Sequence, residues 1–343
     1  MPVFMTFTIR LHNDDRVFTA RDGETVLEAA LRSGLVLPYG CRNGACGTCK
    51  GKLLGGEIRY RDIALTGITQ EERKSGSVLF CQALPASDLV IETRRIHSKG
   101  FPPIHRLPCR VYRLEKCNDI ILRLYLKLPA TEQFHLLPGQ HIDVIMPDGA
   151  RRSYSLANAP HVHDHLELHV RHYPGGHFSE YAFTNLEEKT LLRIEGPLGT
   201  FTLREDSDRP MIMVAGGTGL APIKSIIEHI LHKQIGREVY LYWGARTARD
   251  LYLHDLACQW AGRHEHIRYI PVLSEQCREG QWSGRRGLVH ETVLEDFPDL
   301  SGYEVYTCGP PPLVHAVKDT FIRHGLSPEF IYSDSFETAP ATS

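Results

Sequence analysis

The chain has 343 residues, 42% of them hydrophobic and 23% charged, which is long enough for two or three domains with sizeable cores. Its formal net charge of −2 argues against a strongly basic surface of the kind that binds nucleic acid or anionic membranes. No stretch approaches the ~20 apolar residues of a membrane span, and the N-terminus lacks the basic-then-apolar order of a signal peptide.

The N-terminal quarter has the pattern of a small sheet crossed by one helix. Strands are predicted over 3–11 and 16–20, and apolar residues recur at helical spacing over 24–33. Asp22 is the expected cap of this helix and Gly34 its expected end. Three further strands are predicted at 50–54, 78–81 and 88–92.

Four cysteines stand in the order C-x4-C-x2-C with a fourth 32 positions later, namely Cys41, Cys46, Cys49 and Cys81. This is the plant-type spacing for a [2Fe–2S] cluster held by four thiolates. Gly44 and Gly47 supply the backbone freedom that a loop needs to wrap a small anionic cluster. Cys46 and Cys49 alone would also fit zinc or a redox dithiol, but the full set favours the cluster.

Five cysteines lie outside this motif, at positions 109, 117, 258, 277 and 308. They are widely spaced and odd in number, which favours free thiols in a reducing compartment over a disulfide framework. We therefore expect a cytoplasmic protein.

Residues 94–108 contain one glycine and three prolines and are predicted to form a linker. Short strands follow from Cys109 onwards, separated by turn signals at Pro138-Gly139 and Asp148-Gly149, which predicts a small antiparallel β-barrel. The expected strands are 109–115, 120–127, 141–145 and 166–171.

Polar residues in this barrel form a set that suits a flavin. The Arg152 guanidinium could donate two hydrogen bonds to a pyrophosphate, and the Tyr154 ring could pack against the isoalloxazine. The Ser155 hydroxyl could hydrogen-bond near the reactive ring nitrogen of the flavin. Arg152 alone would be no more than a solvated turn arginine, but further residues accompany it. These are Arg171, then Gly176 and Ser179 at the opening of a helix whose N–H groups suit phosphate, then Gly196-Pro-Leu-Gly199 and Phe201.

Beyond residue 205 short apolar strands alternate with helices, which predicts a parallel α/β domain with its ligands at the strand carboxyl ends. Strands are expected at 211–214, 239–243, 267–272 and 305–307, and helices at 222–232, 251–260 and 313–324.

A glycine-rich run joins the first of these strands to a helix. In this context, such a run typically binds phosphate through its backbone N–H groups. Pro222 stands where a third glycine would be, and proline is favourable in a first helical turn. The residues of the run are Gly216, Gly217, Thr218 and Gly219. Another strand ends in Cys308-Gly309-Pro310. Cys308 is a candidate for the nucleotide site, and the alternative interpretation is that it is a buried, inert thiol.

Through these motifs the first 93 residues resemble plant-type ferredoxins, and residues 109 to 337 resemble the ferredoxin–NADP reductase superfamily. The resemblance implies a multidomain protein with an α+β ferredoxin-like (β-grasp) [2Fe–2S] domain, an antiparallel β-barrel for FAD and an α/β parallel-sheet domain for NAD(P)H. It implies that Ser155, Cys308 and Phe336 are catalytic, with Phe336 covering the flavin ring. It implies that the residues binding FAD or NAD(P)H are Arg152, Tyr154, Ser155, Arg171, Gly176, Ser179, Gly216, Gly217, Thr218, Gly219, Cys308, Gly309, Pro310 and Phe336. The expected segments are 1–93, a linker over 94–108, 109–205, 206–337 and a tail over 338–343.

The domain order resembles reductase components that pass electrons from NAD(P)H through FAD and the cluster to a partner oxygenase, hydroxylase or iron–sulfur dehydratase. One alternative is a stand-alone flavin or quinone reductase with a small acceptor. Another is an iron–sulfur redox sensor, for which the chain lacks a DNA-binding pattern. Arg246, Arg249 and Asp250 offer both basic and acidic groups to the nucleotide, and the resemblance favours NADH over NADPH.

A run of histidines overlaps the predicted barrel, from His161 through His163, His165 and His169 to His172. The first three alternate and could share one face of a strand. No pattern of Asp or Glu completes a metal site, so we expect ordinary loop and strand histidines.

Overall fold

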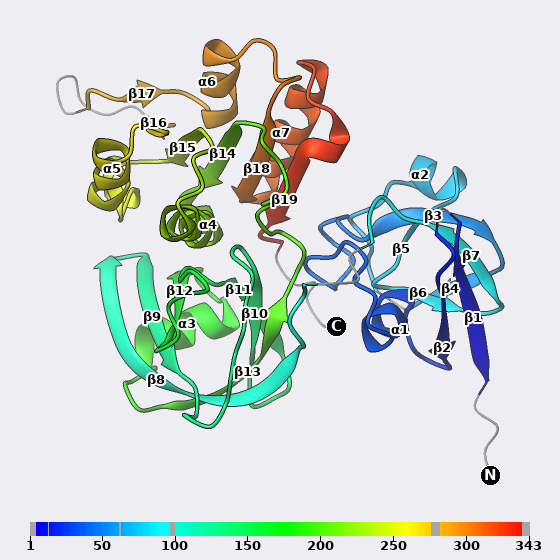
Figure 1. The fold of residues 1–343 in the computed structure, drawn as a ribbon. Coiled ribbons are helices and arrows are strands. Elements are labelled where there is room, and N and C mark those ends of the chain that lie inside the picture. Colours follow the sequence, from blue (N-terminus) through cyan, green and yellow to red (C-terminus); the bar gives the residue numbers. More distant parts are fainter. Residues whose placement is uncertain (1–4, 13, 62, 97–99, 276–281, 338–343) are drawn as a thin grey trace. The chain divides into compact units, whose positions relative to one another are not determined.

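The computed structural model describes residues 5–12, 14–61, 63–96, 100–275 and 282–337 (Figure 1). The chain divides into two compact units. The first comprises Met1–Phe101 with Phe336–Ser343, and the second comprises Pro102–Ser335.

The first unit is built on a mixed five-stranded sheet in the order β2-β1-β7-β3-β5, beside a two-stranded sheet of β4 and β6 (Figure 1). Strand β1 pairs with β7 in parallel and with β2 antiparallel, and two helices accompany this mixed sheet, as expected for the predicted α+β domain. The strands are β1 (Thr6–Leu11), β2 (Val17–Arg21), β3 (Lys50–Gly55), β4 (Ile58–Tyr60), β5 (Ser77–Leu79), β6 (Ala83–Pro85) and β7 (Leu89–Glu92). The helices are α1 (Val26–Arg32) and α2 (Gln70–Lys74).

Helix α1 begins after Thr25, so the prediction that Asp22 caps it is wrong. The Thr25 hydroxyl accepts from the N–H of Glu28, and the Glu28 carboxylate accepts from the N–H of Thr25 at 2.8 Å. This reciprocal capping box satisfies two backbone donors at once, which a single carboxylate further upstream does not. Gly34 follows the helix at φ +75° and ends it as predicted.

The second unit begins with a six-stranded antiparallel sheet in the order β11-β10-β13-β8-β9-β12. A bridge between Leu156 and Leu168 joins its two outer strands, so the sheet closes into the predicted barrel. Its strands are β8 (His105–Asn118), β9 (Ile121–Lys127), β10 (His141–Ile145), β11 (Arg151–Ser155), β12 (Leu166–Arg171) and β13 (Leu191–Leu198), and α3 (His177–Thr184) lies between β12 and β13. Strand β8 begins within the segment predicted as a linker.

The barrel interior is filled by alternate residues of these strands. On β12, Leu166, Leu168 and Val170 belong to the core cluster, together with Ile142 and Val144 of β10. The intervening residues of β12 therefore point to the opposite face.

The rest of the second unit is an all-parallel sheet in the order β17-β16-β15-β14-β18-β19 with helices packed on it, as predicted (Figure 1). Its strands are β14 (Met211–Gly216), β15 (Val239–Ala245), β16 (Ile267–Leu273), β17 (Arg285–Arg286), β18 (Glu304–Gly309) and β19 (Ile331–Ser335). Its helices are α4 (Leu220–Lys233), α5 (His254–Arg263), α6 (Val289–Asp296) and α7 (Pro311–Arg323).

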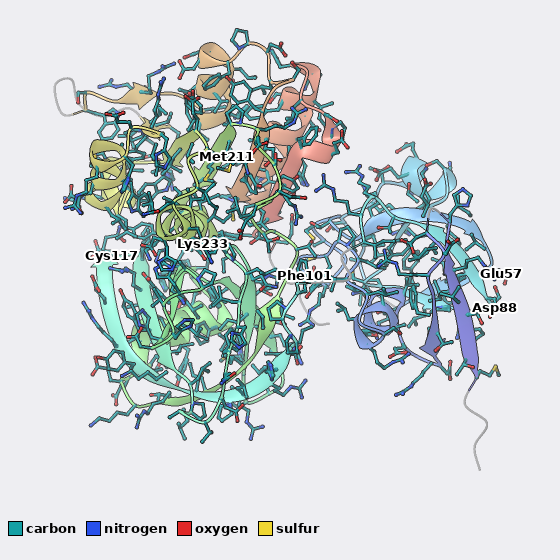
Figure 2. The ribbon with its side chains drawn as sticks, in the orientation of Figure 1. Glu57, Asp88, Phe101, Cys117, Met211 and Lys233 are labelled. Atoms are coloured by element: carbon teal, nitrogen blue, oxygen red, sulfur yellow. The ribbon has the colours of Figure 1, made fainter. Side chains whose placement is uncertain are left out.

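The barrel and the α/β domain meet within this second unit. Cys117 lies at the end of β8 beside the α/β domain (Figure 2), and the next residue, Asn118, donates its amide to the Arg249 carbonyl at 2.7 Å. Within the described part of the chain, no helix has the length and apolar character needed to cross a membrane.

His161, His163 and His165 do not share a strand face, and the expectation of ordinary loop histidines is confirmed for them. These three residues lie in the loop between β11 and β12. The His161 ring instead stacks on that of His232 in α4, with centroids 3.9 Å apart. No three His, Cys, Asp or Glu side chains of the described residues are grouped so that they could hold a single metal ion.

Candidate functional site

The four cysteines of the first motif come together in the first unit. Cys46, Cys49 and Cys81 are buried, and Cys41 is partly buried. They form two pairs. The backbone N–H of Cys41 approaches Cys46 Sγ at 3.5 Å, the N–H of Cys46 approaches Cys41 Sγ at 3.3 Å, and the Cys49 thiol hydrogen-bonds the Cys81 sulfur.

Each pair shows the same electrostatic asymmetry. A hydrogen bond from the Cys41 thiol lowers the pKa of Cys46 to about 6 and raises the pKa of Cys41. A hydrogen bond between Cys49 and Cys81 lowers the pKa of Cys81 and raises the pKa of Cys49 well above its usual range. Two sulfur pairs, each served by backbone N–H groups, suit a two-iron cluster with two thiolates on each iron.

The glycines of the cluster loop are held by close approach to a second loop. Gly44 and Gly47 have φ of +83° and +70°. A Cβ on Gly47 would lie 2.8 Å from the Gly67 carbonyl oxygen, and one on Gly44 would lie 2.6 Å from Leu65. The loop with Leu65 and Gly67 therefore covers the cluster loop, a contact that the cysteine spacing did not reveal.

In the second unit, the barrel motif lies on β11 as predicted. The Tyr154 ring packs 5.2 Å from Phe178 of α3, and burial raises its pKa above the usual range. The Arg152 side chain donates to the Arg151 carbonyl at 2.8 Å. The Ser179 hydroxyl bonds the backbone of Tyr173, so within this fold it holds the turn that opens α3.

The glycine run continues β14 into a 3-10 turn at Gly217–Gly219, from which α4 begins, with Pro222 in its first turn. The turn lies against the end of β18. A Cβ on Gly219 would be 2.1 Å from the Cys308 carbonyl oxygen, and one on Gly216 would be 3.0 Å from Pro310. The glycines thus bring both strand-to-helix turns together at the carboxyl end of the sheet, where Thr218, Gly309 and Pro310 also lie.

Two predicted catalytic residues from different domains meet at one carboxylate. The Ser155 hydroxyl donates to Asp334 Oδ2 at 3.2 Å, and the Cys308 thiol lies 3.9 Å from the same oxygen. Burial, followed by the charge of Asp334, raises the pKa of Cys308 well above its usual range, so the thiol stays protonated.

Asp334 was not predicted as a site residue, although it lies only two residues before the predicted aromatic Phe336. Phe336 itself falls in the first unit. The place of Phe336 over a flavin stays a prediction.

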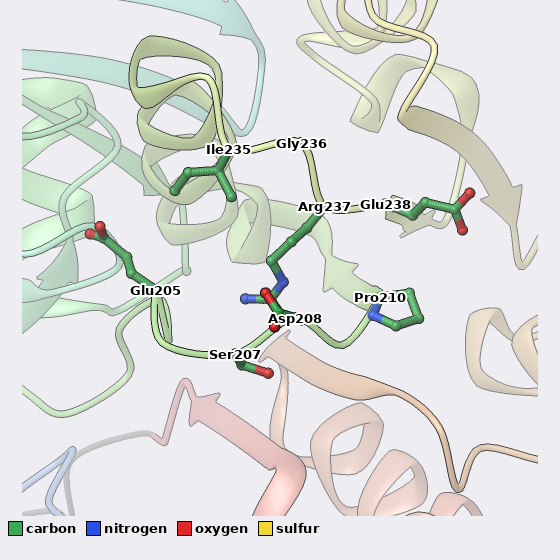
Figure 3. A pocket seen from close by; sticks show the side chains of 8 residues that line it. All are labelled: Glu205, Ser207, Asp208, Pro210, Ile235, Gly236, Arg237 and Glu238. Atoms are coloured by element: carbon green, nitrogen blue, oxygen red, sulfur yellow. The ribbon is translucent and has the colours of Figure 1, made fainter.

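A cavity of about 500 Å³ lies at the other end of the α/β sheet (Figure 3). It is lined where Pro210 precedes β14 and Arg237 precedes β15, at the amino ends of the strands. The Arg237 guanidinium is engaged by the carbonyls of Arg204 and Arg209 and by Glu304. None of the predicted site residues lines this cavity.

Family models match three consecutive parts of the chain. A 2Fe-2S iron-sulfur cluster binding domain matches residues 9–86, an oxidoreductase FAD-binding domain matches 108–203, and an oxidoreductase NAD-binding domain matches 213–319. Together they follow the predicted order of the three domains.

Relatives match nearly the whole chain. It is 40% identical to a CDP-6-deoxy-L-threo-D-glycero-4-hexulose-3-dehydrase reductase of Yersinia pestis, covering 97% of this chain and 99% of the relative. It is 36% identical to the xylene/toluene monooxygenase electron transfer component of Pseudomonas putida, covering 97% and 94%. Among solved structures, an Amycolatopsis cytochrome P450 reductase has a TM-score of 0.83 at 35% identity, covering 97% and 99%.

Proposed function

The chain belongs to the iron–sulfur flavoprotein reductases of the ferredoxin–NADP reductase superfamily, and from that premise we propose that its electron acceptor is a second enzyme. It is an NAD(P)H-dependent oxidoreductase with domains for a [2Fe–2S] cluster, FAD and NAD(P)H. When bound, FAD would supply the exchange between two-electron and one-electron chemistry, and the cluster would supply one-electron transfer.

The observation that carries the proposal is similarity along the full length, cluster domain included. The 40% identical relative is named as the reductase of a hexulose dehydrase, and several relatives at 33–36% identity are named as electron-transfer or reductase components of oxygenases. We favour a dehydrase-type acceptor because the higher identity extends over 99% of that relative. An oxygenase component is the second candidate, supported by the structural match to the P450 reductase.

In this proposal the chain's own residues have distinct tasks. Cys41, Cys46, Cys49 and Cys81 would hold the cluster. Arg152, Tyr154, Arg171 and the opening of α3 at Gly176 would hold FAD, and the turn at Gly217–Gly219 would hold the nucleotide phosphates. Asp334 orients the Ser155 hydroxyl and the Cys308 thiol toward one point, where the two redox partners would meet.

The proposal is tested by anaerobic stopped-flow mixing with NADH, following flavin and iron–sulfur absorbance separately, with and without a purified acceptor. We expect flavin bleaching first and cluster bleaching second, and faster reoxidation of the cluster by an iron–sulfur sugar dehydrase than by an oxygenase component or free quinone. A cluster that stays oxidised while quinone turns over would instead identify a small-acceptor reductase.

The end of β15 supports NADH as the electron donor. Arg246, one of the two arginines that we expect near a nucleotide ribose, forms an ion pair with Glu275, two residues beyond the end of β16. A 2′-phosphate would have to displace that carboxylate and would meet its negative charge. We propose that this pair disfavours NADPH.

Replacing Glu275 should therefore weaken the preference for NADH over NADPH. In Glu275→Gln we expect kcat/KM for NADPH to rise by about fivefold, because one repulsive charge is removed, with NADH within about twofold of wild type. Glu238→Gln is the matched control, since Glu238 bonds Tyr240 at the opposite end of the sheet. A native enzyme that already uses NADPH better than NADH would contradict the proposal.

A further inference from the structure

Lys224 of α4 carries an ammonium group from the nucleotide domain into the barrel, and only 5% of the residue is exposed. Its Nζ donates to Glu167 Oε2 on β12 at 3.0 Å and to the Ala157 carbonyl at 3.2 Å. Glu228, one turn along α4, is a third partner at 3.0 Å. A charge is costly to bury unless it is fully paired, so these contacts favour one position of α4 against the barrel, which we call the seat of α4.

Glu167 is the centre of this seat. Besides Lys224, it accepts from Arg123 at 2.8 Å and from His169 Nε2 at 3.0 Å. Burial by itself would raise the pKa of Glu167, but the hydrogen bond from His169 and the charges of Lys224 and Arg123 outweigh it and hold the pKa well below its usual range. The carboxylate therefore stays ionised, with three donors on its two oxygens.

His169 extends the contact from Glu167 back to the nucleotide domain. Burial lowers the pKa of His169, so its ring is neutral and has one N–H. Since an ionised carboxylate can only accept, the network assigns that proton to Nε2, and Nδ1 accepts from Tyr252 Oη at 2.7 Å. Burial also raises the pKa of Tyr252 well above its usual range, which keeps its hydroxyl as the donor.

Tyr252 leads on to the phosphate turn. Its ring packs edge-on against Trp243, with centroids 5.4 Å apart and planes at 86°. The Trp243 indole N–H donates to the Gly217 carbonyl at 2.9 Å. Because the turn at Gly217 leads directly into α4 and so to Lys224, the contacts form a closed ring.

The barrel side of this ring is continuous with the proposed flavin site. Glu167, His169 and Arg171 alternate along β12 and point away from the barrel core. The Arg171 guanidinium approaches the phosphate turn, since a Cβ on Gly217 would lie 3.2 Å from its Nη1. One face of β12 therefore carries two members of the contact ring, Glu167 and His169, and also Arg171, a candidate flavin-binding residue.

We propose that this ring, made of Gly217, Trp243, Tyr252, His169, Glu167 and Lys224, fixes the phosphate turn of the nucleotide domain against the flavin face of the barrel. Tyr252 and Lys224 are its positioning residues, because they hold β12 from two separate segments of the α/β domain, the turn before α5 and helix α4. Small displacements between reacting groups lower rates steeply, so the ring should govern the reduction step more than nucleotide binding.

Tyr252→Phe tests this proposal in the holoprotein, because it removes one hydroxyl and keeps an aromatic side chain packed against Trp243. We expect the limiting rate of flavin reduction by NADH to fall about tenfold while the Kd for NADH changes less than about twofold. Amide hydrogen exchange measured without NADH should quicken about tenfold in 166–171 and 217–224. Tyr240→Phe is the matched control, because its hydroxyl bonds Glu238 away from the barrel.

A double-mutant cycle separates positioning from local damage. Combined with Lys224→Met, Tyr252→Phe should add little to the loss in reduction rate, since either change opens the same ring. Lys224→Gln replaces the methionine variant if the latter fails to fold, because it also removes the ammonium charge. Additive losses, or wild-type reduction and exchange in Tyr252→Phe, would overturn the proposal.

Discussion

In the Cys46→Ser variant, electron delivery to a protein acceptor should fall by at least about 100-fold while NADH still reduces the flavin at the wild-type rate. Cys46 is a buried member of one of the two sulfur pairs: its backbone N–H donates to Cys41 Sγ at 3.3 Å, and its own Sγ lies 3.3 Å from the Thr48 hydroxyl. An alkoxide at this position is a harder and far more basic donor than a thiolate, and it binds iron–sulfur clusters poorly.

The effect should stay local because the cysteines belong to the first compact unit and the flavin and nucleotide motifs to the second. The measurements are iron content, flavin content and stopped-flow absorbance of both groups. Cys258→Ser makes the same exchange at an exposed cysteine outside the motif and should behave as wild type. If Cys46→Ser still delivers electrons at the native rate, the cluster is not on the path.

Sequence patterns predicted the architecture where side chains alternate strictly. Strands β10 and β12 match their predicted bounds, because each is an uninterrupted run with a buried face between clear turn signals. Strand β13 was missed because Arg193, Glu195, Gly196 and Pro197 interrupt its apolar pattern. Helix α2 has no buried residue, so it has no apolar periodicity to detect.

The site divides in a similar way. The cysteine and glycine motifs could be found because their chemistry depends on residues close together in the chain. The convergence of Ser155 with Asp334 joins residues 179 positions apart, and that of Glu167 with Lys224 joins residues 57 positions apart. Such pairs depend on how the barrel packs against the α/β domain, and local sequence patterns do not predict that packing.

Gly219 ends the glycine run where it packs against the end of β18, and adding a single methyl group there should be severely damaging. A Cβ would lie 2.1 Å from the carbonyl oxygen of Cys308, 2.6 Å from its carbonyl carbon and 3.0 Å from the nitrogen of Gly309. All three are backbone atoms at the end of β18, so relief requires moving the start of α4. In Gly219→Ala we expect NADH-dependent flavin reduction to fall at least about 100-fold, since such a shift misplaces the phosphate turn.

The loss should be specific to the nucleotide domain. Flavin content should persist, because Arg152 and Tyr154 lie on β11 of the barrel, while overpacking should lower the free energy of unfolding by about 1–3 kcal/mol. Gly236→Ala is the matched control in the same domain, since nothing lies within 4 Å of its Cβ position. Flavin-to-protein ratio, denaturant unfolding and stopped-flow reduction measure the three quantities. Native reduction by Gly219→Ala would show that α4 and β18 can separate without cost, and the phosphate turn would then not depend on this contact.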